Sequence, residues 1–359
     1  MDTSREIAPN GNTPYEAPWV GEALAAAARA RVTVFGDFAL DAYWAIDPDD
    51  SELSVETLLP VRRVRKQRYS LGGAGNVAAN LLALGVSGVR TVGMVGDDLF
   101  AGELLMQLER AGAAAADMLR RQPDWQTQVF AKPHLDDREQ SRVDFGGFNV
   151  PSPESVDALS SALAAAAERS DAIILNQQVP AGISTEAMIM RLNHLMARNP
   201  DKVFVVDSRH RPGAYNGGHL KMNSHEAAEL AGRPTDLSVP IPQEAAIRFA
   251  RHACERIGKA VFVTRGAEGI IVAEPDRVHV EPGISADGPI DPVGAGDAVT
   301  AAIAAVLGGG GSPELAARLA NVAARVTVGK LQTTGVASPS EIIAMSRGGE
   351  NRRIPPLKQ

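Results

Sequence analysis

The chain has 359 residues, 45% of them hydrophobic, which suits one large α/β core with a small additional element. Its formal net charge of −7 argues against nucleic acid as the main partner, because phosphate backbones bind basic surfaces. The single cysteine, Cys254, excludes an internal disulfide and a cysteine-rich zinc site, and no apolar run is long enough to span a membrane.

The first thirty residues predict a polar tail followed by one short helix. Residues 1–18 are rich in Pro, Gly and Asn, which is typical of a mobile tail, and VGEALAAAARA at 20–30 has the composition of a helix. The tail carries Asp2 and Glu6 and lacks the apolar core of a signal peptide. A cytoplasmic location is therefore the default expectation.

Two strand-rich inserts follow, at about 43–70 and 124–147. The run ARVTVFGD before the first insert predicts a buried strand that ends at a glycine. Within the first insert, basic and apolar residues alternate, which predicts an exposed strand with one covered face. The second insert alternates in the same way and predicts a hairpin with Asp136 and Asp137 near its turn.

The remaining chain alternates strands and helices. The apolar runs DAIILN, KVFVVDS, AVFVTRG and GIIVAE predict strands, and helices are expected at 184–198, 224–231 and 241–256, with two more near the C-terminus. This alternation predicts a mainly parallel sheet covered on both faces. The main domain is expected to span 31–346, with a C-terminal tail at 347–359.

A glycine-rich turn, Asp291-Pro-Val-Gly-Ala-Gly-Asp297, opens directly into an apolar helix. Helix N-termini present unpaired N–H groups and a positive dipole end, so Gly294, Ala295 and Gly296 can form an anion cradle. Asp297 beside this cradle could accept a proton from a hydroxyl that attacks a bound phosphorus. Asp is also among the best helix-capping residues, so these residues alone leave a plain N-cap open.

Four further motifs occur in a fixed order with this turn, and the set is far more specific than one glycine-rich loop. They are GDFALD at Gly36–Asp41, the glycine turn and helix at Leu71–Gly85, N-x-x-E at Asn223–Glu226 and TRGAEG at Thr264–Gly269. Together they resemble the ribokinase-like sugar kinases, also called the phosphofructokinase-B family. The resemblance extends from about Val32 to about Glu341.

The resemblance implies a three-layer α/β/α fold with a mainly parallel sheet, over which the two inserts form a small β lid. It also implies ATP-dependent phosphorylation of a hydroxyl on a sugar or sugar phosphate. The segments GDFALDAYW and GGAGNVAANLLALG look closest to the heptose-7-phosphate kinase branch, in which the anomeric hydroxyl is phosphorylated. The lid segment SELSVET and the strand end Asn176–Gln178 differ from that branch, which leaves a different acceptor open. A nucleotidyltransferase domain can follow the kinase in that branch, but none is expected here.

The resemblance assigns Asp297 as the catalytic base. It also assigns the N–H groups of Gly294, Ala295 and Gly296 as donors to the transferring phosphoryl group. Most relatives carry threonine or another small residue where this chain has Pro292, and proline removes one N–H. This departure concerns the details of the loop and leaves the assignment of Asp297 in place.

The acceptor site is expected near the end of the first strand. Ligands of open α/β sheets gather at the carboxyl ends of strands, and carboxylates accept several hydrogen bonds from sugar hydroxyls. Asp37 could simply end the strand and Asp41 could be a solvated surface group. The resemblance favours sugar contacts for both, and it places Gly72, Gly73 and Asn76 in the sugar pocket.

The nucleotide and its metal ion are expected at the other motifs. Asn223 and Glu226 could form a helix capping box, whereas in the family this element organises Mg²⁺ and its waters. Thr264 and Gly266 resemble the family's nucleotide-binding turn. Asn321 falls where the family lines its adenine pocket, although it could be a buried polar helix residue.

Many relatives also bind a monovalent cation such as K⁺ through backbone oxygens, at positions that correspond to Asp291 and Val293. The lid carries a basic run that is mostly typical of a solvated strand edge, where charge discourages aggregation. One or two of these cations, or of those in the second insert, could instead reach an anionic sugar. The residues concerned are Arg62, Arg63, Arg65, Lys66, Arg68, Lys132 and Arg142.

Two other classes of protein were compared with the kinase interpretation. A non-catalytic sugar- or nucleotide-binding regulator could keep the fold, but it would need no base at Asp297. A nicotinamide-dependent oxidoreductase is suggested only by glycine-rich turns, and no G-x-G-x-x-G follows the first strand. The expected substrate is a small sugar, with no nucleic acid or membrane partner, and a homodimer through the lid strands would cover an exposed sheet face.

Overall fold

The computed structural model describes residues 18–49, 51–113, 119–136, 138–286, 288–331 and 333–349. The predictions for the N-terminal tail before Pro18, for Asp137 and for the end of the C-terminal tail lie outside the described residues. Within the ranges described, no helix combines the length and the apolar character needed to cross a membrane.

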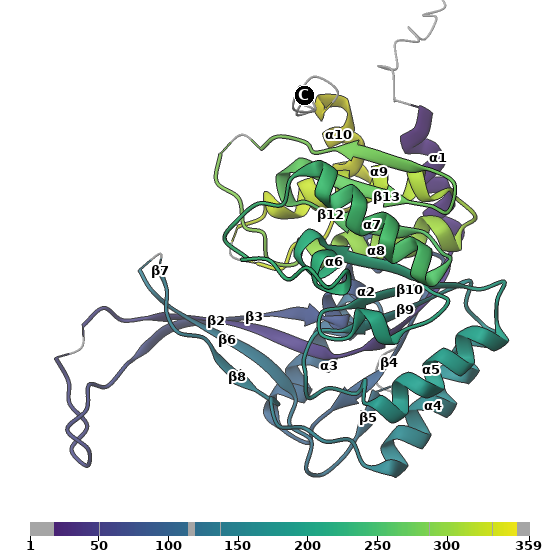
Figure 1. The fold of residues 1–359 in the computed structure, drawn as a ribbon. Helices are drawn as coiled ribbons and strands as arrows, with labels where there is room; N and C mark the ends of the chain where they lie inside the picture. The colour runs from purple at the N-terminus through teal and green to yellow at the C-terminus, as the bar shows by residue number, and fades with distance from the viewer. Residues whose placement is uncertain are drawn as a thin grey trace, which may run out of the picture.

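A nine-stranded sheet forms the middle layer of the molecule, in the order β14-β13-β12-β11-β10-β9-β1-β4-β5 (Figure 1). The pairs from β12 to β5 are parallel, and β13 and β14 are antiparallel at one edge. The strands are β1 (Arg31–Gly36), β4 (Gly88–Val95), β5 (Leu119–Arg121), β9 (Ala172–Gln177), β10 (Val203–Ser208), β11 (His219–Asn223), β12 (Val261–Thr264), β13 (Gly269–Ala273) and β14 (Val278–Pro282). The predicted mainly parallel sheet is confirmed.

Helices cover both faces of this sheet because the apolar strands are buried on both sides. One core contains buried residues of α1, α2, α3, α8, α9 and α10, and the other contains those of α4, α5, α6 and α7. The helices are α1 (Pro18–Arg29), α2 (Ala74–Leu84), α3 (Leu99–Ala111), α4 (Pro153–Glu168), α5 (Glu186–Arg198), α6 (Ser224–Leu230), α7 (Gln243–Ile257), α8 (Ala295–Gly308), α9 (Pro313–Val328) and α10 (Pro339–Gly349). In β9, Ala172 and Ile174 face the first core, whereas Ile173 and Leu175 face the second.

The C-terminal region contains three helices rather than the two that the sequence predicted. The additional helix is α10, which begins just after Ser338. The backbone N–H of Ser338 donates to Glu341 Oε2 at 2.9 Å, and the Ser338 hydroxyl bonds the same oxygen at 2.8 Å. Hydrogen bonds between residues three apart in this way are typical of a helix start. The pattern S-P-S-E is also typical of a turn, which is why the sequence did not predict this helix.

The two inserts form a second, smaller sheet that projects from the main body (Figure 1). Its order is β3-β2-β6-β7, and β8 also pairs with β6. The strands are β2 (Phe38–Ile46), β3 (Val64–Gly73), β6 (Gln128–Leu135), β7 (Arg138–Glu139) and β8 (Val143–Phe145). The predicted hairpin is present as antiparallel β6 and β7, and Asp136 takes the left-handed conformation at its turn.

The small sheet and the large sheet are joined at two points. Only Asp37 separates β1 from β2, and β3 runs directly into α2 at Gly73. The carboxyl ends of β1, β9, β10 and β11 therefore lie beside the base of the lid. This edge, where ligands of open α/β sheets gather, is where the predicted site residues come together.

Candidate active site

The first turn of α8 is the predicted anion cradle. Gly294 is the N-cap residue with φ +80°, and a β-carbon added there would lie 2.7 Å from Asn76 Nδ2, so only glycine fits. The N–H of Ala295 donates to the Pro292 carbonyl at 3.2 Å. In the part of the chain that the structure describes, the N–H groups of Gly294 and Gly296 have no hydrogen-bond acceptor. Gly294 and Gly296 are therefore the open donors of the cradle.

Asp297 lies within the first turn of α8 and does not cap the helix. Gly294 is the N-cap, with no side-chain cap hydrogen bond, and Asp297 Oδ2 instead accepts a hydrogen bond from Asn76 Nδ2 at 2.9 Å. The pKa of Asp297 is raised to about 7, mainly because of burial; the hydrogen bond from Asn76 opposes this shift and the charge of Asp207 adds to it. A carboxylate with this pKa can accept a proton near neutral pH.

Asn76 is itself held in place by α2. The Nδ2 of Asn80, one turn further along the helix, donates to the Asn76 carbonyl at 2.9 Å and to Asn76 Oδ1 at 3.2 Å. With its oxygen occupied by Asn80, the Asn76 amide turns its nitrogen toward Asp297. Both asparagines are buried. Asn80 therefore fixes the orientation of the residue that contacts the candidate base.

Four residues on adjacent strands form a cross-strand row beneath the start of α8. They are Gly36 of β1, Asn176 of β9, Asp207 of β10 and Lys221 of β11, paired in register. Asp207 Oδ2 accepts a hydrogen bond from Thr300 Oγ1 of α8 at 2.6 Å and another from Lys221 Nζ at 3.0 Å. The row therefore fastens the cradle helix to the strand ends.

The sequence interpretation did not single out Asp207, Lys221 or Thr300. The sequence does contain one feature that points to each of the two charged residues. Asp207 ends the apolar run VFVVDS, as Asp37 ends the first strand, and Lys221 stands inside the buried strand HLKMN. A charge inside a buried strand needs a partner, which makes it a candidate for a site even without a motif.

Asp41 and Lys132 form a buried ion pair at the base of the lid. Asp41 Oδ1 and Lys132 Nζ are 2.6 Å apart, and both side chains are 8% exposed. The Lys132 ammonium also lies 4.9 Å from the centre of the Tyr43 ring. Burial raises the pKa of Asp41, although the charge of Lys132 opposes the shift. Gly72 approaches this pair closely, since a β-carbon on it would lie 3.0 Å from Asp41 Oδ2.

Asp37 organises the loop that follows β9. Its Oδ2 accepts from the N–H groups of Gln178 and Val179 at 2.8 and 3.2 Å, and its Oδ1 accepts from Ile183 at 3.1 Å. Burial raises its pKa to about 6, although these three hydrogen bonds lower it. Gly73, beside Asp37, would bring a β-carbon within 3.5 Å of Gln178 Cγ. The loop thus places Gln178 next to the glycine turn, while a sugar contact by Asp37 itself stays a prediction.

Asn223 and Glu226 form the capping box that the residue pattern also allowed. Asn223 Oδ1 accepts from the N–H groups of His225 and Glu226, and Glu226 Oε2 accepts from the Asn223 N–H at 2.7 Å. Burial raises the pKa of Glu226, and the charge of Lys221 opposes the shift. Among the described residues, no three His, Cys, Asp or Glu side chains converge as metal ligands. Asn223 and Glu226 therefore suit a Mg²⁺ ion only if the ion keeps most of its water ligands.

The predicted nucleotide residues lie further along the same edge. Thr264 pairs in register with Asn223, so the two motifs are neighbours. Gly266 is exposed at the start of the short turn Gly266–Glu268. Asn321 is buried in α9, and its Nδ2 donates to the carbonyl of Pro282 at 2.8 Å. This bond ties α9 to the end of β14, and an adenine contact by Asn321 stays a prediction.

The positions proposed for a monovalent cation form the turn before the cradle. The carboxylate of Asp291 accepts a hydrogen bond from the Val293 N–H at 3.0 Å, and the Asp291 N–H donates to Val328. These two bonds use the Asp291 side chain and two N–H groups, so the backbone oxygen of Val293 takes part in neither. Occupancy by a cation stays a prediction.

Three exposed arginines of the lid pair with carboxylates of the lid itself. Arg63 contacts Asp49 at 3.1 Å and Arg65 contacts Asp47 at 2.9 Å. Arg142 forms a similar exposed pair with a neighbouring aspartate. These pairs match the solvated strand edge expected of the basic run. Lys132 differs, because it is buried at the candidate acceptor site.

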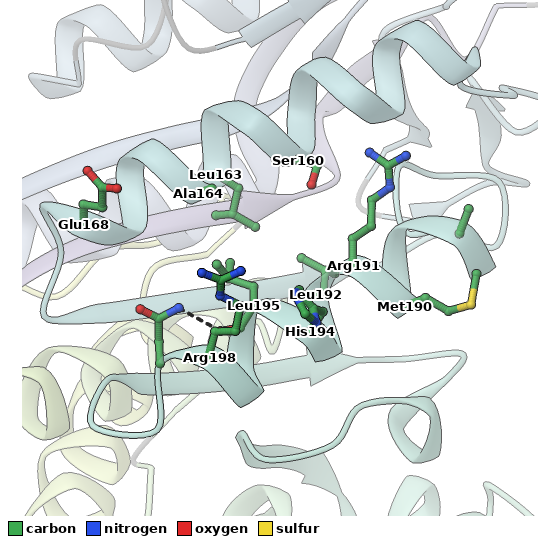
Figure 2. A pocket seen from close by; sticks show the side chains of 12 residues that line it. Ser160, Leu163, Ala164, Glu168, Met190, Arg191, Leu192, His194, Leu195 and Arg198 are labelled. Carbon is green, nitrogen blue, oxygen red and sulfur yellow. Dashed lines mark hydrogen bonds between the residues drawn. The ribbon is translucent and has the colours of Figure 1, made fainter.

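A separate hollow of about 830 Å³ lies between α4 and α5, away from the motif residues (Figure 2). Its lining includes Leu163, Leu192 and Leu195 together with Arg191 and Arg198. No residue of the predicted site lines this hollow. The chemistry-bearing residues gather instead at the carboxyl edge of the large sheet.

A partly buried carboxylate beside the predicted anion cradle, under a lid with a further carboxylate, suits transfer of a phosphoryl group to a hydroxyl. Residues 30–340 match the model of the pfkB family carbohydrate kinases. The chain belongs to this family of sugar kinases, and the resemblance noted in the sequence is confirmed.

Curated relatives agree with this membership, and a solved structure agrees with the fold. The chain is 32% identical over 330 residues to the bifunctional protein HldE of Caulobacter sp. (strain K31), covering 89% of this chain and 63% of that protein. It is also 32% identical over 316 residues to D-beta-D-heptose 7-phosphate kinase of Bordetella bronchiseptica, covering 86% and 94%. The structure of Arabidopsis thaliana ribokinase complexed with ribose and ATP matches with a TM-score of 0.69 at 18% identity, covering 89% and 99%. The chain thus spans under two thirds of the bifunctional relative, and the ribokinase-like fold is confirmed.

Proposed function

We propose that this protein transfers the γ-phosphate of ATP to a hydroxyl of a sugar or sugar phosphate, with a heptose 7-phosphate as the first acceptor to test. The observation that carries the proposal is the hydrogen bond between Asn76 and Asp297 beside the open N–H donors of α8. The acceptor class comes from the names of the relatives, HldE and heptose 7-phosphate kinase.

In the proposed reaction, the acceptor hydroxyl oxygen attacks the γ-phosphorus. A new O–P bond forms, the bond from the γ-phosphorus to the bridging oxygen breaks, and ADP leaves. The hydroxyl proton passes to Asp297 Oδ1, because Oδ2 already accepts from Asn76. The N–H groups of Gly294 and Gly296 then face the charge that spreads over the phosphoryl oxygens.

The acceptor would lie between the cradle and the base of the lid. Asp41 supplies a carboxylate that can bond sugar hydroxyls, and Lys132 supplies a buried cation beside it. The amide of Asn176 is buried and has no hydrogen-bond partner among the described residues, so this strand end has donors and acceptors to offer. These groups suit an acceptor with several hydroxyls and one anionic group.

Two ions belong to the proposal. Mg²⁺ would be held near Glu226 and Asn223 through its waters, and it would neutralise charge on the nucleotide phosphates. K⁺ would be held by backbone oxygens near Asp291 and Val293. Because ATP is the donor, the reaction is expected in the cytoplasm.

A homodimer through the lid is the proposed assembly. The loop between β2 and β3 exposes apolar side chains, with Val55 89%, Leu58 72% and Leu59 65% accessible. An exposed group of this kind is typical of a surface that another chain covers. Sedimentation of the purified protein, with Leu58→Glu as the comparison, would test this assembly.

The experiment that tests the function is an assay of ATP-dependent ADP release with a panel of sugars and their phosphates. Wild-type protein should release ADP with at least one acceptor, and Asp297→Asn should not do so above background. Absence of acceptor-dependent ADP release across heptose, hexose and pentose phosphates and their neutral sugars would overturn the proposal.

A further inference from the structure

Lys221 is a buried lysine that lies under the anion cradle. Its side chain is 10% exposed, and its ammonium is 3.0 Å from Asp207 Oδ2. A β-carbon placed on Gly296 would lie 3.1 Å from Lys221 Nζ, so the ammonium closely approaches the backbone of the cradle. The lysine comes from β11 and the cradle from α8, so the sheet positions a cation against the helix start.

The ammonium of Lys221 lies among carboxylates. It is 3.0 Å from Asp207 Oδ2, and the charges of Glu226 and Asp297 also act on it. Three carboxylates therefore surround one cation at the edge of the sheet. A further anion, such as a nucleotide phosphate, could enter this region only with additional positive charge nearby.

Lys221 also has more donors than the protein uses. An ammonium carries three N–H donors, and Asp207 is the one acceptor within hydrogen-bond distance in the described part of the chain. Asp207 Oδ2 is shared, because it also accepts from Thr300 at 2.6 Å. Leaving donors of a buried cation unused is unfavourable, so a ligand that accepts from them would bind with a gain.

We propose that Lys221 is a catalytic residue that donates to an oxygen of the transferring phosphoryl group, next to the N–H of Gly296. This inference rests on the proposed kinase function and extends it. Asp207 holds the ammonium in place before ATP binds, and the flexible four-carbon stem lets it turn toward the phosphate. Lysine suits this part because it acts on phosphate as a compact point charge. The charge would count most in the transition state, when it spreads over the phosphoryl oxygens.

A purely structural part for Lys221 makes a different prediction. If the lysine served only to neutralise Asp207, its loss would lower stability and would weaken all nucleotide complexes to a similar degree. If it contacts the transferring group, its loss should spare ADP binding and weaken the complex of ADP with aluminium fluoride and acceptor, which imitates the transition state.

The test compares Lys221→Met and Lys221→Arg with the wild type. Lys202→Met is the matched control. Lys202 lies just before β10, at the amino ends of the strands and away from the site, where it donates to the Ser170 carbonyl oxygen. We expect Lys221→Met to lower kcat by about 10²-fold or more, as loss of one transition-state donor does, with ADP affinity within about threefold of the wild type. Its affinity for the aluminium fluoride complex should fall by a similar factor to kcat. Lys221→Arg should keep part of the activity, and Lys202→Met should keep all of it.

Three results would overturn the inference. One is a Lys221→Met protein with near-normal kcat, and another is an equal loss of affinity for ADP and for the aluminium fluoride complex. If Lys221→Met does not fold, a wild-type structure with ADP, aluminium fluoride and acceptor decides. Lys221 Nζ should then lie about 3 Å from a fluoride or phosphate oxygen, and an ammonium that contacts only Asp207 would overturn the inference. A wild type that is active and needs Asp297 but not Lys221 would leave the proposed function intact.

Discussion

The side-chain amide of Asn76 donates a hydrogen bond of 2.9 Å to Asp297 Oδ2, although the two residues are 221 positions apart in the chain. Asn76 lies in the first turn of α2 and Asp297 in the first turn of α8, and both helices follow glycine-rich turns. The bond therefore joins the two helix starts that border the candidate active site. It also fixes which oxygen of Asp297 is available for a proton.

Asp297→Asn should leave the fold and nucleotide binding intact and lower kcat by about 10²-fold or more, because the positioned base is removed. The amide has nearly the same shape as the carboxylate, so ATP affinity serves as the control. Steady-state kinetics on the acceptor found in the panel would check this. Near-normal turnover of the variant would show that Asp297 is not the base.

The same variant should be more stable than the wild type at high pH. Burial raises the pKa of Asp297 from 3.8 to about 7, so the folded state binds a proton that the unfolded state has released between those values. Wild-type stability from this group is therefore fully present below about pH 4 and is lost as the pH rises to about 7. Asparagine removes that dependence. We expect Asp297→Asn to gain about 2 kcal/mol at pH 8 and almost nothing at pH 4, measured by urea unfolding.

The pH dependence of turnover should follow the protonation of Asp297. The base must be ionised, so kcat/KM for the acceptor should rise with pH through about 7 and then level off. The hydrogen bond from Asn76 lowers this pKa, so Asn76→Ala should move the rising limb to higher pH. Wild-type and variant profiles with the same midpoint would show that the pair does not control the ionisation.

The Glu226→Gln variant distinguishes a helix-capping role of Glu226 from a role in binding Mg²⁺. A glutamine oxygen can still accept the N–H of Asn223, so α6 should keep its start and its thermal stability. The negative charge is lost, so the Mg²⁺ concentration for half-maximal rate should rise, by about tenfold. Glu341→Gln is a matched control, since Glu341 bonds the N–H of Ser338 in a similar exchange at the start of α10. Unchanged metal dependence would restrict Glu226 to capping.

The sequence was most informative where local pattern determines structure. The alternation of apolar strands and helices predicted the parallel sheet. The pattern of the inserts predicted strands, and the family resemblance implied that these strands form a lid. The glycine turn before α8 predicted an anion cradle and pointed to Asp297, because a turn that feeds a helix is visible in a short window. Asn76 was assigned to the sugar pocket through the family resemblance, and its hydrogen bond to Asp297 was not predicted.

The contacts between distant segments could not be predicted in the same way. Asp207 and Lys221 meet because β10 lies beside β11, and strand order is a property of the whole sheet. Similarly, Lys132 reaches Asp41 because β6 pairs in parallel with β2 inside the lid. Single charged residues in strands carry no motif, so their partners appear only when the strands are placed together.

The final prediction concerns the ion pair of Asp41 and Lys132 and the charge of the acceptor. Asp41→Ala should raise the KM for the acceptor by about tenfold or more and leave the KM for ATP nearly unchanged, since sugar hydroxyls lose their acceptor. This change also leaves Lys132 buried without its partner. The decisive measurement is therefore the ratio of the kcat/KM values for two acceptors rather than the rate with one acceptor.

Lys132→Met should lower the kcat/KM for a sugar phosphate relative to the matching neutral sugar by about tenfold, if the ammonium contacts the acceptor phosphate. Arg63→Met is the control, because Arg63 is exposed and pairs with carboxylates of the lid loop. Its ratio should equal that of the wild type. If only neutral sugars react and the Lys132 variant does not change their ranking, a heptose phosphate acceptor is excluded. A sugar kinase with a neutral acceptor would then be the remaining assignment, because Asp297 and its cradle do not depend on the lid cation.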